Sequence, residues 1–418
     1  MKKCLKIIVI IILIIVLVIL IKLKINQSNR QKEGNLSFLD NDVYDTENSS
    51  LSIETIGNKI VTSEEILKEK TYESLSPDES TILVKDGGNA LISDTKINKT
   101  GDSTNTKNSE LYGVNSTILV KTRSSATIKN TEINASAEGA NAVFSTGEGS
   151  KIYISDSKII STGNSYSRGL DATYGGYIEA NNINILTQGV GSPLIYSNGK
   201  IIVSNSEGNA SSAQIAVIEG KNTATIKNSN LKCSGIGIAS SVDNCGILIY
   251  QSMSEDETDG IGKFNAVNSN LSIDKDSNYY KTAPFFFVTN TKATINLENN
   301  NLFYGSNLLL KIKGTDKLSK SKSNGGEVTL NATNQKLIGN IELDNISTLE
   351  MNLTNGSTLE GTINSDNTAK SISLSLDNST KLTLTGNSYL TSLTDTDPSY
   401  SNINFNGYKL YVNGKPIN

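Results

Sequence analysis

The sequence contains no histidine and no tryptophan among its 418 residues. Without histidine, the chain cannot form a Ser-His-Asp triad, a Cys-His catalytic pair or a zinc site that needs imidazole. Any metal site would therefore depend on carboxylate, carbonyl or thiolate ligands. Without tryptophan, the chain lacks the largest ring on which a sugar can stack, which weighs against cleavage of polysaccharides.

Cysteine is scarce as well. The chain has three, Cys4, Cys233 and Cys245, which are too few for a disulfide scaffold. Cys233 and Cys245 would be able to pair in an oxidising compartment. Two small thiol residues without a disulfide are an equally good interpretation, so the sequence leaves both alternatives open.

Acidic residues are missing from residues 1–32, which contain seven lysines and arginines. The whole chain has 38 basic and 42 acidic residues, so the remainder has 31 basic against 42 acidic side chains and a formal charge of −11. A body of this charge repels nucleic acid. We therefore expect no nucleic-acid partner.

A long apolar run lies close to the N-terminus. Residues 7–21 are apolar without interruption, and the run covers 5–23 if the two lysines within it reach out to the interface. A helix of these 19 residues is roughly 28 Å long, which matches the hydrocarbon core of a bilayer. Residues 1–27 contain none of the small residues that a signal-peptide cleavage site needs. We therefore predict an uncleaved transmembrane signal anchor over residues 1–24 rather than a removed signal peptide.

Charge does not decide the orientation of this segment, because lysines flank both of its ends. The composition of the remaining chain favours a body outside the cell. We expect a single-pass protein of the cell membrane that contacts the bilayer through residues 5–23. Residues 25–75 would then form a polar stalk and a cap, in which Thr62–Lys70 has the serine, early acids and final lysine of a short helix.

A hexapeptide, STILVK, occurs at Ser80–Lys85 and again at Ser116–Lys121. Each hexapeptide leads into a pattern that has eight copies in the chain: two alternating apolar residues, then an asparagine or aspartate and, in all copies but one, a later isoleucine or leucine. Alternating side chains point to one face of a β-strand. Asparagine and aspartate tolerate the left-handed backbone of a sharp bend, and their side chains can stack as a ladder. The eight turn positions are Asp94, Asn130, Asp156, Asn182, Asn205, Asn228, Asn268 and Asn299.

The spacing of these copies distinguishes a solenoid from an ordinary set of β-turns. Neighbouring copies lie 23 to 40 residues apart. The short spacings fit one turn of a three-stranded parallel β-helix, and the long ones fit the same turn with an inserted loop. Residues 348–359 and 371–382 repeat the pattern at a shift of 23. The sequence therefore predicts an all-β parallel β-helix, or β-solenoid, of about twelve coils over residues 76–418.

Several segments combine this pattern with glycine, tyrosine and acidic residues between the strands. They are Tyr166–Ile185, Ala216–Leu231, Ile247–Phe264 and Tyr389–Asp397. With the C-terminal YKLYVNGK, they resemble a group of adhesin-like bacterial surface proteins, common in Gram-positive anaerobes, over about residues 78–415. The resemblance implies a right-handed, single-stranded parallel β-helix outside the cell. It implies adhesion only by analogy of fold.

Binding is the preferred functional hypothesis. The sheets of a β-helix would expose many asparagine, serine and threonine side chains, and inserted loops such as 100–115 and 235–262 are natural contact sites. We expect an adhesin-like binder of a glycan, a matrix component or a partner-cell surface. A polysaccharide lyase or glycoside hydrolase is the first alternative, and a passive structural spacer is the second.

Six residues are candidates for ligand binding, and no catalytic residue is assigned. They are Arg168, Asp171, Tyr174, Glu219, Tyr250 and Gln251. Asp171 and Glu219 follow equivalent strands two coils apart, so roughly 10 Å would separate their carboxylates if both faced the same way. The alternative is that these residues are solvated exterior residues or form hydrogen bonds between coils.

An acidic run at Ser254–Gly260 is a candidate site for Ca²⁺, the one cofactor considered. Its acids are Glu255, Asp256, Glu257 and Asp259. Their spacing differs from that of an EF-hand loop, so a solvated loop is the alternative.

Overall fold

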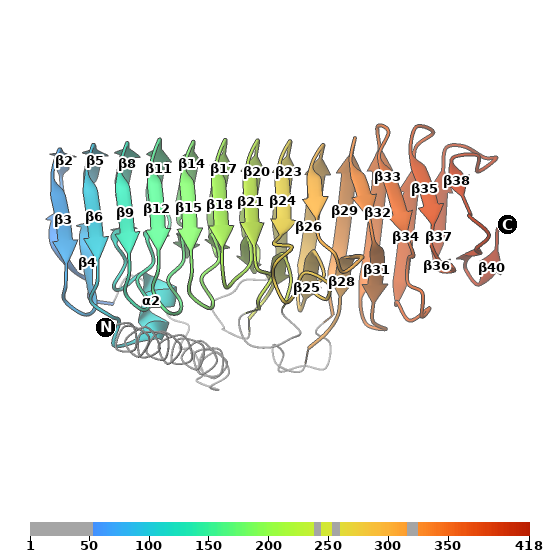
Figure 1. Ribbon diagram of the computed structural model, residues 1–418, viewed down its shortest axis with the longest axis horizontal. Coiled ribbons are helices and arrows are strands. Elements are labelled where there is room, and N and C mark those ends of the chain that lie inside the picture. The colour runs from blue at the N-terminus through green and yellow to red at the C-terminus, as the bar shows by residue number, and fades with distance from the viewer. Residues whose placement is uncertain (1–52, 238–243, 253–259, 316–324) are drawn as a thin grey trace, which may run out of the picture. The chain divides into compact units, whose positions relative to one another are not determined.

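The computed structural model describes residues 53–237, 244–252, 260–315 and 325–418. In these ranges the regular elements are β-strands apart from one short helix, α2 (Thr106–Tyr112). In the long sheets the strands run parallel to one another and are stacked side by side (Figure 1). The fold is therefore all-β with long parallel sheets, the arrangement of a β-solenoid.

The first sheet has 11 strands, and consecutive members are three strands apart in the chain. Its strands are β1 (Ile56–Val61), β4 (Glu79–Val84), β7 (Ile118–Lys121), β10 (Val143–Thr146), β13 (Leu170–Thr173), β16 (Ile195–Ser197), β19 (Ala216–Glu219), β22 (Ile247–Tyr250), β25 (Phe286–Thr289), β28 (Leu308–Ile312) and β31 (Asn340–Leu343). Most residues of this sheet are buried, whichever of its two faces they lie on.

The second sheet has 13 strands. In most coils its strand comes next in the chain after the strand of the first sheet. Its strands are β2 (Glu64–Lys68), β5 (Asn89–Ser93), β8 (Ser125–Lys129), β11 (Lys151–Ser155), β14 (Tyr177–Asn181), β17 (Lys200–Ser204), β20 (Thr223–Lys227), β23 (Ile261–Val267), β26 (Lys292–Glu298), β29 (Glu327–Thr333), β32 (Thr348–Thr354), β34 (Ser371–Leu376) and β37 (Ser392–Asp395). Its strands alternate buried and exposed residues, so one face points into the core and the other faces solvent.

The third strand of each coil joins the third sheet and, towards the C-terminus, the fourth. The third sheet contains β3 (Thr71–Ser74), β6 (Lys96–Lys99), β9 (Glu132–Ala135), β12 (Lys158–Ser161), β15 (Asn184–Thr187), β18 (Glu207–Ala210), β21 (Asn230–Cys233), β24 (Asn270–Ile273) and β27 (Asn301–Phe303). The fourth contains β30 (Lys336–Ile338), β33 (Thr358–Gly361), β35 (Lys381–Leu384) and β38 (Ile403–Asn404).

The register confirms the repeat that the sequence predicts. The second apolar position of every copy falls in one row of the second sheet, where Ile92 pairs with Ile128 and Ile128 with Ile154. The row continues through Ala180, Val203, Ile226, Ala266 and Leu297. The C-terminal match holds as well, since Met351 pairs with Leu374. Each coil therefore buries its apolar side chains on those of its neighbours.

The eight predicted turn positions all adopt the left-handed backbone, with φ between 47° and 54°. Their side chains also form hydrogen bonds from coil to coil. The Nδ2 of Asn130 donates to Asp94 Oδ1 over 2.6 Å, and the Nδ2 of Asn299 donates to Asn268 Oδ1 over 2.7 Å. The amide of Asn130 lowers the pKa of Asp94, because it donates to the charged carboxylate. Side-chain hydrogen bonds join the eight positions as four pairs of neighbouring coils.

A second ladder, one residue further along, was not predicted. The hydroxyl of Ser157 accepts the backbone N–H of Thr131 over 3.1 Å and donates to the carbonyl of Ser155 over 2.6 Å. Ser229 receives the N–H of Ser206 in the same way. These hydroxyls are buried and satisfy backbone groups at the bend that no strand can reach. The recurring serine or threonine after the asparagine was visible in the sequence.

The helix expected over Thr62–Lys70 is wrong. Residues Glu64–Lys68 form β2, in which Leu67 pairs with Ile92 and is 2% exposed. Glu69 follows in the left-handed position of the ladder, with φ 54°. Pairing with the neighbouring strand and burial of Leu67 override the helical propensity of the acids and lysines. The coils therefore start at least as early as Ile56, inside the segment assigned to the stalk and cap.

The last strands of the chain include a fifth sheet. It consists of β36 (Ser388–Leu390), β39 (Leu410–Val412) and β40 (Lys415–Pro416), and β40 pairs antiparallel to β39. Tyr389 stacks on Tyr411 with ring centroids 4.7 Å apart. A very short edge strand with lysine and proline discourages further strand pairing.

No helix of the described residues is long and apolar enough to cross a membrane. Residues 1–24, for which the transmembrane anchor is predicted, lie outside the described ranges.

The ladder gives a first testable prediction. Replacing Asn182 by valine should destabilise the protein by about 1–2 kcal/mol, because a β-branched residue is strained at φ 53° and the bond to Asp156 is lost. The control is Asn184→Val, which places the same side chain in strand β15 and should change stability by about 0.5 kcal/mol or less. Thermal unfolding followed by circular dichroism measures both. Equal effects would contradict the assigned role of the left-handed turn.

Candidate functional site

Four of the six candidate residues come together at the outward face of the first sheet. Asp171 pairs with Tyr196 of the next coil, and Glu219 pairs with Tyr250. Leu170, which precedes Asp171, packs in the core, so the alternation of the strand turns Asp171 outward. Arg168 lies two residues before β13 and reaches over the same face.

Arg168 is the centre of this cluster, with 1% of its surface exposed. Its Nη1 donates to Asp171 Oδ2 over 2.8 Å, and its Nη2 donates to Glu110 Oε2 over 3.1 Å. The guanidinium also lies 3.6 Å from the ring centroid of Tyr196, which places the cation over the aromatic face. The sequence did not point to Glu110 or Tyr196.

The cluster continues along the stack through Tyr196. Its hydroxyl donates a short hydrogen bond to Glu219 Oε2 and lies 3.0 Å from the hydroxyl of Tyr250. Asp171 is fully buried and Glu219 is 5% exposed. The interpretation of these residues as solvated is therefore wrong. Hydrogen bonding between coils, the other part of that alternative, describes what they do.

The two remaining candidates lie at the margin of the cluster. Tyr174 stacks against Tyr112 of α2, with ring centroids 5.7 Å apart and an interplanar angle of 1°. Gln251 follows β22, and its backbone carbonyl accepts a hydrogen bond from Asn290. Neither is shown to touch the guanidinium of Arg168.

The insertion at 100–115 supplies Glu110, and it forms α2 instead of an open loop. Asn105 caps the helix by accepting the N–H of Asn108, and Gly113 ends it with φ 70°. A Cβ on Gly113 would lie 2.6 Å from the ring of Phe144. The helix therefore lies directly on the first sheet, where Thr173 donates to the carbonyl of Leu111.

The charges of the cluster do not balance. One guanidinium faces three buried carboxyl groups, those of Glu110, Asp171 and Glu219. Burial raises the pKa of Glu110 to about 7 and that of Asp171 to about 6, although Arg168 opposes both shifts. Burial and Glu219 also raise the pKa of Tyr196 well above its usual value. The cluster therefore takes up protons near neutral pH.

Two buried polar atoms of the cluster have no hydrogen-bond partner: Arg168 Nε and Asp171 Oδ1. A protonated Asp171 or Glu110 would relieve the excess of negative charge, and this is how like-charged buried carboxyl groups usually adjust. The carboxyl groups of Glu110, Asp171 and Glu219 are buried and contact Arg168 or Tyr196 instead of solvent. The described arrangement suits a structural or proton-responsive element better than an open substrate site.

Two further hypotheses from the sequence concern a metal site and a disulfide between Cys233 and Cys245. No group of three or more acidic or cysteine side chains there could hold a metal ion. The calcium candidates Glu255, Asp256, Glu257 and Asp259 lie outside the described residues. Cys233 is a buried free thiol, so a disulfide to Cys245 does not form in this structure. Burial raises the pKa of Cys233 to about 12, which makes its thiol unreactive.

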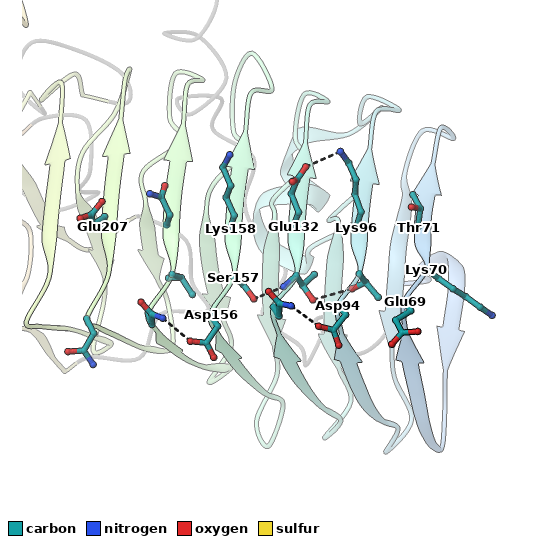
Figure 2. A pocket seen from close by; sticks show the side chains of 17 residues that line it. Glu69, Lys70, Thr71, Asp94, Lys96, Glu132, Asp156, Ser157, Lys158 and Glu207 are labelled. Atoms are coloured by element: carbon teal, nitrogen blue, oxygen red, sulfur yellow. Dashed lines mark hydrogen bonds and ion pairs between the residues drawn. The ribbon is translucent and has the colours of Figure 1, made fainter.

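An open groove runs along the corner between the second and third sheets. Its volume is about 950 Å³. Figure 2 shows two rows of side chains in it, one at the turn ladder and one on the outward face of the third sheet. The turn row includes Glu69, Asp94, Asn130, Asp156, Asn182 and Asn205, and the sheet row includes Thr71, Lys96, Glu132, Lys158, Asn184 and Glu207.

The groove presents hydrogen-bonding groups at every coil. Lys96 and Glu132 form an exposed ion pair of 3.0 Å across neighbouring strands (Figure 2). Lys158 follows in the next strand, where it pairs in register with Glu132. Because successive coils lie about 4.8 Å apart, these groups repeat with the short period of a linear polymer. The sequence identified the turn ladder but did not indicate that it borders a groove.

Comparison with models of known protein families and with curated proteins finds no match. The resemblance to adhesin-like surface proteins therefore stays a prediction.

Proposed function

We propose that this chain is an adhesin-like surface protein that binds an extended glycan, or a glycan-bearing matrix or cell surface, in the groove between the second and third sheets. Its β-solenoid would be a right-handed, single-stranded parallel β-helix of about twelve coils, since parallel crossover connections are almost always right-handed. Residues 5–23 would anchor it in the cell membrane, with the body outside the cell. The length of the apolar run supports the membrane anchor, and the composition of the remaining chain supports a body outside the cell.

The groove is the observation that carries the proposal. It is open along its length, as binding of a chain longer than the groove requires, and it is lined by carboxylates, amides, hydroxyls and lysines. These groups form the dense hydrogen bonds that sugar hydroxyls need. The repeat of the groups at each coil suits a ligand that repeats as well.

The enzyme alternative rests on Asp171 and Glu219. Both carboxyl groups are engaged by Arg168 or Tyr196 and are buried, which favours binding over cleavage as the proposed activity. A passive spacer needs no open groove with ordered polar rows, so the groove also favours a binder over a spacer.

The test is a glycan-array screen of the full-length protein in mild detergent, with and without added Ca²⁺. The groove variant is Glu132→Ala/Lys158→Ala, which removes one charge of each sign from the sheet row. We expect it to weaken binding of the best neutral or acidic glycan about tenfold, because two polar contacts are lost.

The matched control is Lys336→Ala/Glu360→Ala on the exposed face of the fourth sheet, which changes the same two residue types. It should bind like the unchanged protein. If no glycan binds, or if both double variants lose binding equally, the groove is not the binding site. Release of new sugar ends during the incubation would favour the enzyme alternative instead.

A further inference from the structure

Part of the solvent-exposed face of the second sheet, from β8 to β23, carries charge of the opposite sign to the protein as a whole. Six consecutive strands, β8 to β23, contain five lysines and a single acid, Glu179. The formal charge of the whole chain is −4. The lysines are Lys129, Lys151, Lys200, Lys227 and Lys263, and all five are exposed. This basic face shares no residue with the groove.

The lysines follow the stack from coil to coil. Lys151 pairs in register with Tyr177, and Tyr177 pairs with Lys200, so the three side chains lie in one row across neighbouring strands. Lys263 continues the row in β23, opposite Thr223. Lys129 lies near Asp94 and Asp156 of the turn ladder, which offset part of its charge.

Two tyrosines form an aromatic platform in the middle of the basic face. Tyr153 is 41% exposed, and its ring lies 5.9 Å from that of Tyr177 at an angle of 57°. The ammonium of Lys200 lies 5.7 Å from the ring centroid of Tyr177. The hydroxyl of Tyr177 donates to Glu179, which holds the ring in place and engages the single acid of the face. Exposed aromatic rings beside cations offer both an apolar and a charged contact.

We propose that the basic face binds a linear anionic glycan, in which carboxylate or sulfate groups contact the lysines and a sugar ring stacks on Tyr153. Charge complementarity selects the anion. The basic face has one or two charges for every two coils, a spacing of about 5–10 Å along the stack. That density matches a polymer with one charge for each sugar or pair of sugars. Duplex DNA is far denser, with a charge every ~1.7 Å.

The absence of arginine from these six strands also favours a glycan over nucleic acid as the ligand. Arginine is the residue that binds phosphates and bases in two-pronged contacts, whereas lysine is a hydrated point charge. The proposal goes beyond the groove, because it concerns a different surface and a charged ligand class.

The experiment measures binding of the full-length protein to immobilised polygalacturonate and dextran sulfate, with neutral dextran for comparison. We expect binding to at least one of the two anionic polymers and none to dextran. Raising the ionic strength from about 50 to about 300 mM should weaken it at least about tenfold. Carboxylate and sulfate sources are distinguished by which of the two polymers binds more tightly.

Two variants locate the ligand on the basic face. Lys151→Gln/Lys200→Gln should weaken binding about tenfold, and Tyr153→Ala should weaken it about fivefold without changing its salt dependence. The matched control, Lys336→Gln/Lys381→Gln, removes two exposed lysines from the fourth sheet and should leave binding within about twofold. The groove variant Glu132→Ala/Lys158→Ala should also retain binding of the anionic polymer. The experiment can therefore contradict the proposal for the basic face without contradicting the proposal for the groove, and the reverse.

Three results would overturn the proposal. The first is equal binding to dextran and the anionic polymers. The second is an equal loss in the control and in the double lysine variant. The third is tighter binding to single-stranded poly(dT) or to phosphatidylserine vesicles than to either anionic glycan, which would assign the face to nucleic acid or to a lipid surface.

Discussion

Replacing Arg168 by methionine should lower the free energy of unfolding by about 3–5 kcal/mol near neutral pH, because it leaves buried carboxyl groups without their cation. Arg168 is 1% exposed and donates to both Asp171 and Glu110. Methionine has a similar length and keeps most of the packing on Tyr196. The lost unfolding free energy would therefore reflect the missing positive charge rather than a change in side-chain volume. Denaturant unfolding, followed by circular dichroism, measures it.

The loss should shrink as the pH falls. In the folded protein the pKa of Glu110 is raised from 4.5 to about 7 and that of Asp171 from 3.8 to about 6. A raised pKa means that these carboxyl groups bind protons more tightly in the folded than in the unfolded protein. The stability gained from this tighter proton binding is fully present below about pH 4 and is lost as the pH rises to about 7. Near pH 5 the Arg168→Met variant should therefore lie closer to the unchanged protein than near pH 8.

A second variant keeps this prediction testable if Arg168→Met does not fold. Glu110→Gln replaces the carboxyl group with a neutral side chain of the same size, so the loss of stability between about pH 5 and about pH 7 should become smaller. The control is Lys292→Met, which breaks an ion pair whose side chains are both 61% exposed and should change stability by less than about 1 kcal/mol. An unaltered pH profile in Glu110→Gln would show that this carboxyl group is not the one that titrates.

Phe286→Ala should cost about 3–5 kcal/mol, because it opens a cavity in the most aromatic part of the core. Phe286 is 1% exposed, and its ring contacts Phe285 and Phe264 at centroid distances of 5.0 and 5.7 Å. The matched control is Phe303→Ala, which removes a ring that is 54% exposed and should have a much smaller effect. Denaturant unfolding compares the two variants.

The damage from Phe286→Ala should also be local. Coils of a solenoid contact their neighbours, so stability is roughly a sum of coil and interface contributions. Hydrogen exchange should therefore rise most in β22, β25 and β28 and stay near its usual rate in β5 and β8. A uniform increase along the whole stack would contradict independent coils and indicate a single cooperative unit.

The repeating parts of the fold could be predicted because each position obeys a local rule. Ile128 and Ile154 share a row since strand alternation and coil length fix where each side chain points. Asn182 bends the chain because few other residues accept its φ. The helix prediction for Thr62–Lys70 was wrong for the opposite reason. The local propensity of these residues is helical, and only pairing with the neighbouring coil makes them a strand.

The candidate site was harder, because its environment comes from a segment outside the repeat. Arg168 and Asp171 were identified, but nothing in the periodic pattern places Glu110 beside them. Its position depends on the way α2 folds back onto the first sheet. Whether a carboxyl group is solvated or buried is decided by such an insertion, so the sequence left both the face and the exposure of Asp171 open. Tyr196 lies in β16, and nothing in the repeating pattern distinguished it from other strand residues.

The direction of the hydrogen bonds between coils has a mechanical consequence. They lie along the stack, while the covalent chain circulates across it, so a pull along the axis loads hydrogen bonds rather than the backbone. A coil of 23 residues, such as that from Ile201 to Ala224, occupies about 4.8 Å of the stack and about 80 Å when pulled straight. A tether built this way would yield under tension one coil at a time, lengthening many times over while its far end stays attached.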